Sequence, residues 1–482
     1  MTTPQKLRIA FIHPDLGIGG AERLVVDAAL GLQKLGHSVD IYTSHHDPTH
    51  CFDETRDGTL RVHNVVPPFP RSYKGKFHIL FSHARQLHLT AHLLRPSAPA
   101  FDVYFVDQLS TCVPLLRAFA GTRIVFYCHF PDKLLADGEY VEGKVQRKGG
   151  GALKRIYRLP MDLLEELTTR QADIILANSN FTSRVFKAHF RSIQTTPKVV
   201  YPGINLSAYE ATSVDSQDPD MVAVASERPT LLSLNRFEKK KNAALAIDAF
   251  AILRKKLSEN STPTFENTRL VIAGGYDPRV EDNMMTLVGL IDHAKANSLT
   301  YNIITPSDSR ITVPPFNCTP LGPDVLFLLN FTTSQRSALL SAPSTLVLLY
   351  TPTNEHFGIG PVEGMVCGLP ILACNTGGPT ESVVDQPPEE RTGWLRPPVP
   401  ETWAEALVEI VGMKRAEREA LSTRATRRAR EHFGMEAMAK GIEGTLQEAV
   451  AMGPVSSSFP HLALLAVLLV FVAYVLRTLD FP

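Results

Sequence analysis

The chain has 482 residues, more than a single hydrophobic core usually organises, so two or three domains are expected. Lysine plus arginine and aspartate plus glutamate each number 49, and this balance excludes a protein that recruits nucleic acid through its net charge. The six cysteines form no Cys-x-x-Cys pair and no metal-ligand spacing, which indicates reduced thiols in a cytosolic setting rather than a disulfide framework or a zinc site.

The first part of the chain alternates short apolar runs with amphipathic stretches. No secretory signal precedes the strand expected at residues 7–12, and the helix expected at 22–35 ends at Gly36. Further strands are predicted at residues 38–43, 101–106, 123–128 and 173–177. This alternation is typical of an α/β fold with a doubly wound parallel sheet.

A glycine-rich loop follows the first predicted strand. Glycines between a strand and a helix let the backbone approach a phosphate, so Gly19 and Gly20 are candidate donor-binding residues. The dinucleotide fingerprint has a third glycine where this chain has Glu22, and Asp40 lies at the start of the second strand rather than near its end. A nicotinamide enzyme is therefore disfavoured, and an ordinary tight turn is the alternative.

His129 directly follows the strand predicted at residues 123–128. An imidazole in this place can donate a hydrogen bond to a hydroxyl or to a developing charge, so His129 is a candidate catalytic residue. A partly buried histidine with a structural role is an equal alternative. Upstream, residues 71–94 combine lysines, histidines and large apolar side chains, which predicts a core helix or, with less weight, an interfacial helix for a lipid-linked acceptor.

The second part of the chain repeats the strand and helix pattern after a Ser-, Asp- and Pro-rich stretch at 211–228 that we expect to be a loop. Residues 297–324 contain five prolines and are expected to form a long irregular loop. The remaining predictions are strands at 230–234, 269–273, 344–350 and 370–373, a helix at 242–255, and helical structure over 401–450.

A basic cluster follows the strand predicted at 230–234. Arg236 and Lys241 are expected at the carboxyl edge of the sheet, where a guanidinium can fork two oxygens and an ammonium supplies a compact charge. Both are therefore candidates to bind a diphosphate and to assist its departure. Lys239 and Lys240 are expected to face solvent, as most lysine runs do.

The most informative stretch runs from Glu355 to Glu363 and reads Glu-His-Phe-Gly-Ile-Gly-Pro-Val-Glu. It leaves the buried strand predicted at 344–350 and enters a helix expected from Pro361 to Cys367. Proline fits the first helical position, and Gly368 can adopt the left-handed conformation that ends the helix.

A helix start at the carboxyl edge of a parallel sheet offers backbone donors and a partial positive charge to a ligand. The amides of Phe357, Gly358 and Ile359 are candidate donor-binding groups, and the carboxylates of Glu355 and Glu363 can accept hydrogen bonds from hydroxyls. The combination fits a nucleotide sugar. A capping acid followed by a solvated helix acid is the alternative.

Near its carboxyl terminus the chain becomes strongly apolar. Residues 449–476 contain no Asp, Glu, Lys or Arg, which predicts a membrane anchor at 454–482. A buried or interfacial helix is the alternative.

Together these motifs resemble the retaining GT-B glycosyltransferases of the glycosyl transferases group 1 family over nearly the whole chain. Residues 355–363 are similar to the family's Glu-x7-Glu element, Arg236 with Lys241 to its Arg-x4-Lys donor clamp, and Gly19-Gly20 to its amino-domain glycine loop. The resemblance implies two Rossmann-like domains facing each other across a cleft. It divides the chain into an acceptor-side domain at 1–205, a GDP-sugar-binding domain at 206–430, a returning helix at 431–453 and the anchor at 454–482.

Three further segments, residues 14–23, 128–132 and 375–382, are similar to the dolichol-pathway mannosyltransferases that extend mannosyl-chitobiosyl-diphosphodolichol. This resemblance implies GDP-mannose as donor, a dolichol-linked oligosaccharide as acceptor, and addition of an α-1,3 and then an α-1,6 mannose. It places the catalytic domains on the cytosolic face of the endoplasmic reticulum membrane and makes other enzymes of N-glycan precursor synthesis candidate partners. Neither a cofactor nor a metal is implied, since no Asp-x-Asp sequence ends a predicted strand.

In the mechanism that the resemblance implies, Arg236 and Lys241 hold the diphosphate, Glu363 the ribose and Glu355 the mannose, while His129 lies near the reacting carbon. The leaving phosphate takes the acceptor proton, so no protein nucleophile is required. Two alternatives remain: another GT-B transferase with a different nucleotide-sugar donor or lipid acceptor, and a non-catalytic nucleotide-binding scaffold protein.

Overall fold

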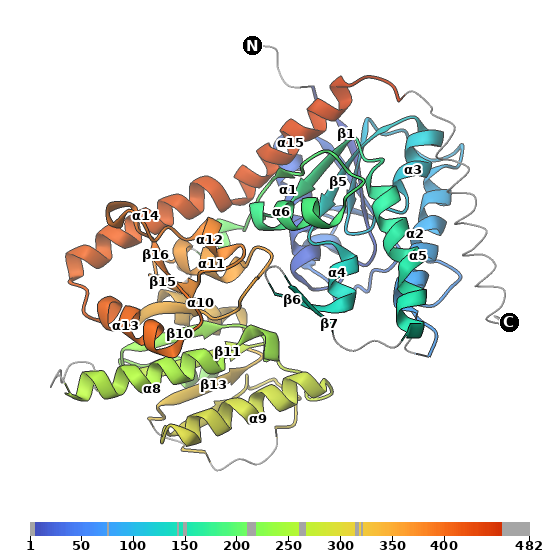
Figure 1. Cartoon of the computed structure of the whole chain (residues 1–482). Helices are drawn as coiled ribbons and strands as arrows, with labels where there is room; N and C mark the ends of the chain where they lie inside the picture. The colour runs from blue at the N-terminus through green and yellow to red at the C-terminus, as the bar shows by residue number, and fades with distance from the viewer. Residues whose placement is uncertain are drawn as a thin grey trace. The chain divides into compact units, whose positions relative to one another are not determined.

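A computed structural model describes residues 5–74, 77–141, 144–147, 152–209, 218–259, 267–313, 318–319 and 322–455 (Figure 1). The chain forms two compact units. The first comprises Met1–Ile204 together with Gly434–Pro482, and the second comprises Asn205–Phe433. The chain therefore leaves the first unit after Ile204 and returns to it at Gly434.

The first unit is built on a seven-stranded parallel sheet with the order β3-β2-β1-β4-β5-β8-β9. Its strands are β1 (Arg8–His13), β2 (Ser38–Thr43), β3 (Arg61–Asn64), β4 (Val103–Asp107), β5 (Arg123–Cys128), β8 (Ile174–Ala177) and β9 (Lys198–Val199). The central strands are buried along almost their whole length because helices cover both faces of the sheet. The doubly wound α/β prediction is confirmed.

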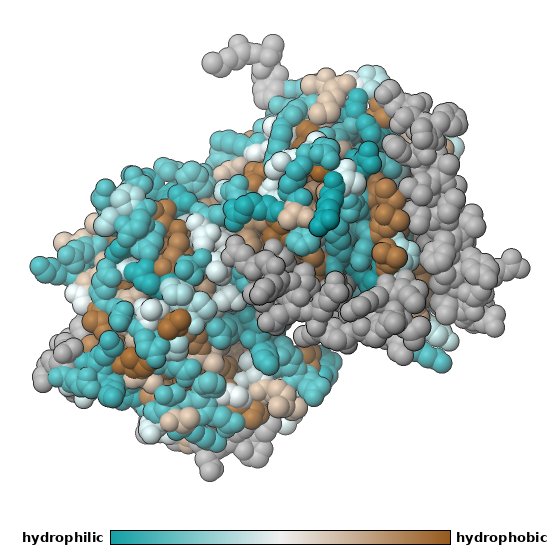
Figure 2. Space-filling model, in the orientation of Figure 1, coloured by the Kyte–Doolittle hydropathy of each residue, from teal (hydrophilic) through white to brown (hydrophobic). Residues whose placement is uncertain are grey.

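Two apolar clusters in the first unit take their residues from opposite faces of its strands. The helices of this unit are α1 (Gly20–Lys34), α2 (His78–Leu93), α3 (Val113–Leu115), α4 (Asp132–Asp137), α5 (Ala152–Thr169), α6 (Asn180–His189) and α15 (Met435–Ala451). The unit also contains the 3-10 helix η1 (Asp53–Thr55), the π-helix η2 (Leu116–Ala120) and the antiparallel pair β6 (Gly138–Val141) and β7 (Lys144–Arg147). Helix α2 buries nine of its side chains, so the stretch at 71–94 contains a core helix. Over α5, Figure 2 shows hydrophobic surface, and Leu159 and Leu163 of that helix are exposed.

Helix α15 closes one face of this sheet from the far end of the chain. It packs against α1, where the missing side chain of Gly31 permits the approach: a Cβ there would lie 2.5 Å from the Cβ of Ala439. Met438, Ile442 and Leu446 of α15 join the same apolar cluster as β1 and β4. The first unit is therefore assembled from both ends of the sequence.

The second unit has its own seven-stranded parallel sheet, with the order β12-β13-β11-β10-β14-β15-β16. Its strands are β10 (Thr230–Leu234), β11 (Arg269–Gly274), β12 (Tyr301–Ile304), β13 (Val325–Leu329), β14 (Thr345–Tyr350), β15 (Ile371–Cys374) and β16 (Gly393–Arg396). Its helices are α7 (Pro219–Val224), α8 (Ala244–Glu259), α9 (Glu281–Ala296), α10 (Thr333–Ser341), α11 (Ile359–Val366), α12 (Pro379–Ser382), α13 (Pro400–Val411) and α14 (Arg415–Phe433), with the turns η3 (Leu206–Tyr209), η4 (Lys239–Lys241) and η6 (Pro388–Glu390).

Three local predictions in the second unit were wrong in part, and residues 211–217, 314–317 and 320–321 of the two predicted loops lie outside the described residues. The stretch at 211–228 contains α7, because Asp218 caps a helix that Pro219 begins. The stretch at 297–324 contains β12, whose backbone pairs with β13. The prolines of the stretch lie outside this strand and therefore do not prevent the pairing. Pro361 is the third residue of α11 rather than the first, since the helix already starts at Ile359. Gly368 adopts the predicted left-handed conformation, with φ of 73°.

The predicted membrane anchor at 454–482 lies outside the described residues except for Pro454 and Val455. In the part of the chain that the structure describes, no helix combines the length and the apolar character needed to cross a bilayer.

Candidate active site

Lys241 and Glu355 meet at the carboxyl edge of the second sheet. They follow β10 and β14, which are neighbouring parallel strands and therefore end at the same edge. The Lys241 Nζ atom lies 2.5 Å from Glu355 Oε2, and the hydroxyl of Thr351 donates to the Lys241 carbonyl at 2.7 Å. Burial opposes ionisation of Glu355, but the Lys241 ammonium outweighs it and holds the pKa of Glu355 below its ordinary value.

The Glu355 loop is shaped by residues that come before and after it in the sequence. The buried hydroxyl of Tyr350 donates to Glu355 Oε2 at 3.3 Å. The amide of Gly378 donates to the Glu355 carbonyl at 2.7 Å. Gly377 has a φ of 73°, and a Cβ there would lie 2.7 Å from the Glu355 backbone nitrogen. The segment at 375–382 therefore packs directly on the loop that carries Glu355.

Phe357, Gly358 and Ile359 lead from this loop into α11. Gly358 caps the helix with a φ of 82°, and its close approach to the ring of Tyr350 leaves no room for a side chain. The helix thus starts at Ile359, four residues after Glu355.

Glu363 lies on α11 with a side chain that is 12% exposed, and it already has two partners. The hydroxyl of Tyr209 donates to Glu363 Oε1, and Arg336 NH1 lies 3.3 Å from the same oxygen. The Arg336 guanidinium also lies 5.0 Å from the centre of the Tyr209 ring. Burial and the Glu363 carboxylate raise the pKa of Tyr209, so its hydroxyl stays protonated and donates.

Sequence reasoning did not identify Tyr209 or Arg336. Tyr209 belongs to η3 and precedes Glu363 by 154 positions, while Arg336 lies on α10. Neither residue sits in a recognisable motif, so only the fold brings them to Glu363.

Arg236 does not join the Lys241–Glu355 pair among the residues that the structure describes. Its side chain is 64% exposed, and its guanidinium lies 3.4 Å from Glu238 Oε1. Lys240 reaches the other oxygen of Glu238 at 3.1 Å and is also largely exposed. The predicted clamp therefore has one residue held in the site and one facing solvent.

In the first unit, Gly19 and Gly20 lie at the start of α1. Gly19 is extended and precedes the helix, and Gly20 is its first residue. The Glu22 carboxylate lies against Gly19, where a Cβ would be 2.2 Å from Glu22 Oε2. A Cβ at Gly20 would meet nothing within 4 Å. At the amino end of this fifteen-residue helix, the space beside Gly20 is therefore open, whereas the Glu22 carboxylate occupies the space beside Gly19.

His129 belongs to a cluster of three polar side chains, His13, Asp107 and His129, which we call the His-Asp-His cluster. His129 Nε2 lies 2.7 Å from Asp107 Oδ1, and His13 Nδ1 lies 2.7 Å from Asp107 Oδ2. Burial opposes ionisation of Asp107, but the two imidazoles outweigh it and lower its pKa to about 2. Burial alone would lower the pKa of His13, whereas its bond to Asp107 raises it.

His13 and Asp107 were missed by sequence reasoning, although a signal existed. Each is the polar last residue of an apolar strand, β1 or β4, and these strands are adjacent in the sheet. Reading the last residues of adjacent strands together would have found them.

The backbone around His129 is also fixed. The side-chain amide of Asn178 donates to the His129 carbonyl at 2.9 Å. Three and four residues further on, the amides of Asp132 and Lys133 donate to the Glu165 carboxylate at 2.7 and 3.0 Å. Burial raises the pKa of Glu165 to about 7. The turn that presents His129 is therefore held on both sides.

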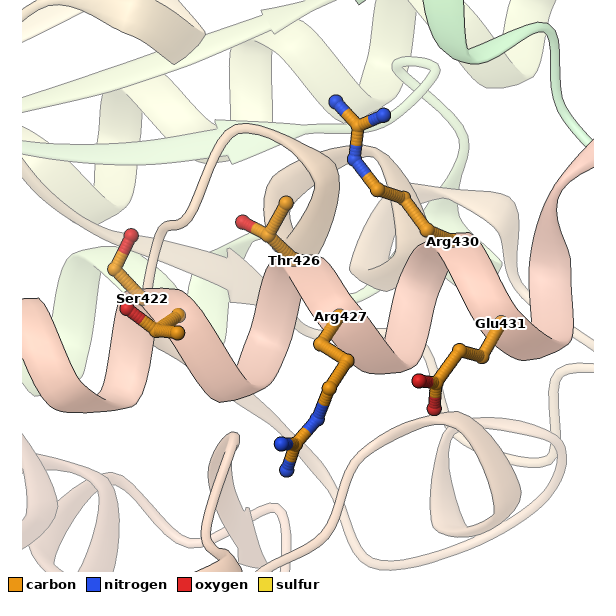
Figure 3. A pocket seen from close by; sticks show the side chains of 6 residues that line it. Ser422, Thr426, Arg427, Arg430 and Glu431 are labelled. Carbon is orange, nitrogen blue, oxygen red and sulfur yellow. The ribbon is translucent and has the colours of Figure 1, made fainter.

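Two further features of the described residues concern metal binding and a surface hollow that lies away from the residues named above. No cluster of three or more His, Cys, Asp or Glu side chains in the described ranges has an arrangement that could hold a metal ion. A surface hollow is lined by one face of α14, and none of the predicted site residues lines it (Figure 3). Its lining residues are Ser422, Thr423, Thr426, Arg427, Arg430 and Glu431.

Comparison with protein families gives two matches along the chain. Residues 18–208 match the family described as Glycosyltransferase Family 4. Residues 216–296 and 319–440 match the family described as Glycosyl transferases group 1. The first match covers most of the first unit, and the second covers most of the second unit.

Curated relatives match almost the whole chain. The alpha-1,3/1,6-mannosyltransferase ALG2 of Rhizomucor pusillus is 45% identical over 459 residues, which cover 95% of this chain and 95% of that protein. The enzyme of the same name from Saccharomyces cerevisiae is 41% identical over 93% of this chain and 86% of its own length. The Schizosaccharomyces pombe enzyme is 42% identical over 93% of this chain and 82% of its own length.

Solved structures show the same fold at low sequence identity. Sucrose-phosphate synthase from Thermosynechococcus elongatus superposes with a TM-score of 0.64 at 18% identity and covers 93% of this chain and 100% of that one. The catalytic domain of starch synthase IV from Arabidopsis thaliana, bound to ADP and acarbose, gives a TM-score of 0.62 at 14% identity. The match covers 93% of this chain and 100% of that one. The likeness supports the predicted GT-B fold.

Proposed function

The chain belongs to the alpha-1,3/1,6-mannosyltransferase family, and on that basis we propose that it transfers mannose from GDP-mannose to mannosyl-chitobiosyl-diphosphodolichol. It adds an α-1,3 and then an α-1,6 mannose in the synthesis of the N-glycan precursor. Identities of 41–45% to these relatives over more than nine tenths of the chain support this function over a different donor or acceptor and over a non-catalytic scaffold.

The structural observation from which donor binding is argued is the contact between Lys241 and Glu355. The two side chains pair with each other, with 2.5 Å between Nζ and Oε2. When GDP-mannose binds, its diphosphate takes the Lys241 ammonium, and the Glu355 carboxylate becomes available to the mannose hydroxyls. Arg236, which is exposed, turns from Glu238 to the same diphosphate.

The α11 helix supports the leaving group. Its amino end, with the backbone of Phe357, Gly358 and Ile359, directs a partial positive charge to the diphosphate. Glu363 accepts from the ribose hydroxyls, either beside the Tyr209 hydroxyl or in its place, because a carboxylate can accept several hydrogen bonds.

In the transfer itself, the bond between the mannose anomeric carbon and the phosphate oxygen breaks, and GDP leaves with the electron pair. The acceptor hydroxyl oxygen bonds to the same face of that carbon, and its proton passes to the departing phosphate. His129 acts on a sugar hydroxyl at this centre, and the Gly19 and Gly20 backbone contacts the donor phosphates. No protein nucleophile or metal ion is used.

The lipid-linked acceptor makes a membrane the natural partner, and we propose that the protein works at the cytosolic face of the endoplasmic reticulum, together with other enzymes of the same precursor. The apolar composition of residues 454–482 supports an anchor there. The exposed Leu159 and Leu163 of α5 are additional apolar surface that suits contact with a bilayer.

The decisive experiment combines the purified chain with GDP-mannose and the lipid-linked mannosyl-chitobiosyl acceptor, followed by linkage analysis of the product. We expect α-1,3 and α-1,6 mannose, with no product from UDP-glucose and undiminished turnover in EDTA. Transfer from UDP-glucose alone would replace the donor assignment, and nucleotide binding without transfer would favour the scaffold alternative.

A further inference from the structure

The His-Asp-His cluster occupies the ends of three neighbouring strands of the first sheet. His13 ends β1, Asp107 ends β4, and His129 directly follows β5, and these strands are consecutive in the sheet order. His13 and Asp107 have side chains that are 1% exposed, whereas the side chain of His129 is 20% exposed. Only one member of the cluster therefore reaches the surface.

The protonation of the cluster follows from its central carboxylate. Asp107 is ionised at neutral pH, since its pKa lies at about 2, and an ionised carboxylate only accepts hydrogen bonds. His13 Nδ1 is hydrogen-bonded to this carboxylate and therefore carries hydrogen, and His129 Nε2, 2.7 Å from the other oxygen in a charge contact, is placed to carry hydrogen as well. A neutral imidazole has one such hydrogen, so the other ring nitrogen of His129, Nδ1, carries a lone pair.

The residues around the His-Asp-His cluster add no charge that would change which nitrogen of His129 carries hydrogen. Burial raises the pKa of both Tyr127 and Cys128, so neither adds a charge beside Asp107. The Tyr127 hydroxyl donates to the Val200 carbonyl at 2.8 Å instead. The remaining charged groups, Asp15 and Glu22, act on the His13 side and favour its protonated form.

A purely structural role explains the cluster poorly. The three strands are already joined by parallel pairing on both sides of β4. Burying an ionised carboxylate with two imidazoles costs desolvation, and well-packed apolar groups usually serve stability as well or better. The arrangement is better explained by a need to control the one imidazole that reaches the surface.

We propose that Asp107 is a positioning residue that holds His129 in the tautomer whose Nδ1 accepts a hydrogen bond from a sugar hydroxyl at the reaction centre. His13 contributes by fixing the second oxygen of Asp107. The inference rests on the proposed transferase function. It also changes the expected role of His129, because Nδ1 in this tautomer accepts from a hydroxyl rather than donating to one.

The test is a double-mutant cycle in the full chain, assayed with GDP-mannose and the lipid-linked acceptor. Asp107→Asn removes the requirement for hydrogen on His129 Nε2, and His129→Gln removes the imidazole. We expect each change to lower kcat by about 10²-fold with the KM for GDP-mannose within a few-fold of wild type. Because Asp107 acts through His129, the double variant should lose little more than either single variant.

Asp173→Asn is the matched control. Asp173 is another carboxylate of the first unit with a 2% exposed side chain, but it pairs with Arg117 and Arg123 at the opposite edge of the sheet. We expect this variant to lower the melting temperature while kcat stays near the wild-type value. Full activity of Asp107→Asn, or losses that multiply in the double variant, would overturn the proposal.

A second arm covers the case in which Asp107→Asn folds poorly. Asp107→Ala leaves space for a small carboxylate, so added formate should restore part of the turnover in Asp107→Ala and none in Asp107→Ala/His129→Gln. Sodium chloride at equal ionic strength is the control. Equal stimulation of both variants would contradict positioning through His129. Failure of the proposed function is recognised separately, because the wild-type chain would then form no mannosylated product.

Discussion

At the scale of single residues, the two carboxylates predicted for the site in the second unit, Glu355 and Glu363, differ in their partners. Glu355 has its charge matched by the Lys241 ammonium, while Glu363 is satisfied by a phenol and a guanidinium. The pair thus differs from the acid and nucleophile of a retaining glycosidase, in which the two carboxyls flank the scissile bond. Here Glu355 faces Lys241, and Glu363 faces Tyr209 and Arg336. In the proposed function, a nucleotide sugar either displaces these partners or binds beside them.

Glu355→Gln should keep GDP binding and lose most turnover. The amide retains the size of the side chain but offers the mannose hydroxyls an uncharged acceptor, so the loss should appear in kcat, by about 10²-fold or more. Steady-state kinetics and GDP titration calorimetry measure the two quantities. Glu389→Gln, an exposed position in η6, is the control and should behave as wild type. Wild-type turnover in Glu355→Gln would refute the assignment.

Glu363→Ala should weaken GDP binding, whereas Tyr209→Phe should not. The alanine removes a charged acceptor from the ribose and leaves Arg336 unpaired, which should weaken binding by about 1.5–3 kcal/mol, roughly ten- to a hundredfold in Kd. The phenylalanine removes only the hydroxyl that now donates to Glu363, so GDP should bind as tightly as before or more tightly. Weaker binding in Tyr209→Phe would show that this hydroxyl contacts the nucleotide.

Asp107 should make stability depend on pH in the acidic range. Its pKa falls from 3.8 to about 2 on folding, so its contribution is fully present above about pH 4 and is lost as the pH falls towards 2. The shift corresponds to about 2 kcal/mol. Urea unfolding from pH 7 to 2.5 should therefore show a steeper acid loss for wild type than for Asp107→Asn. Parallel curves would contradict the depressed pKa.

At the scale of elements, the Glu355 loop depends on the Gly377-Gly378 turn for its position. Gly377→Ala puts a side chain on a backbone with φ of 73° and within 2.7 Å of the Glu355 nitrogen. The loop must then shift, and we expect turnover to fall by more than tenfold, with stability lower by about 1–2 kcal/mol. Kinetics and thermal melting measure both effects.

Gly289→Ala is the matched control for that change. Gly289 lies inside α9, and a Cβ there meets nothing within 4 Å. Alanine favours a helix over glycine by about 1 kcal/mol, so this variant should be active and slightly more stable. Normal turnover in Gly377→Ala would show that the turn does not position Glu355.

Elements with strong local signals were predictable. The strands at Ser38–Thr43, Arg123–Cys128 and Thr230–Leu234 have the predicted bounds, because most residues in each are apolar or β-branched. Strand β12 was missed because its pairing with β13 decides its conformation, and α7 because a single capping aspartate begins it. In the site, Lys241 and Glu355 were predictable from strand ends, whereas Tyr209 and Arg336 required the fold.

At the scale of the whole molecule, the two units divide the predicted site residues between them. Gly19, Gly20 and His129 belong to the first unit, and Arg236, Lys241, Glu355 and Glu363 belong to the second. Each unit carries its groups at the ends of its own parallel strands, where ligands bind in open α/β sheets. Transfer between a nucleotide sugar and a lipid-linked acceptor suits such a division.

Deleting residues 459–482 should separate membrane attachment from catalysis. The deletion leaves α15 and both described sheets intact, so the melting temperature and GDP binding should remain at the wild-type level. Liposome flotation should decrease strongly, and turnover should persist with a detergent-solubilised acceptor. Flotation at the wild-type level would show that another surface, for which the exposed Leu159 and Leu163 are candidates, holds the protein on the membrane.

The return of the chain to the first unit at Gly434 also sets an order of assembly during translation. Residues 5–204 emerge from the ribosome early, but one apolar face of their sheet and α1 stays uncovered until α15 has been synthesised. The second unit, which is continuous in sequence, can complete its core first. The amino-terminal half of this protein is thus the last to mature, and a ribosome that stalls before Gly434 would release a chain with an exposed, aggregation-prone surface.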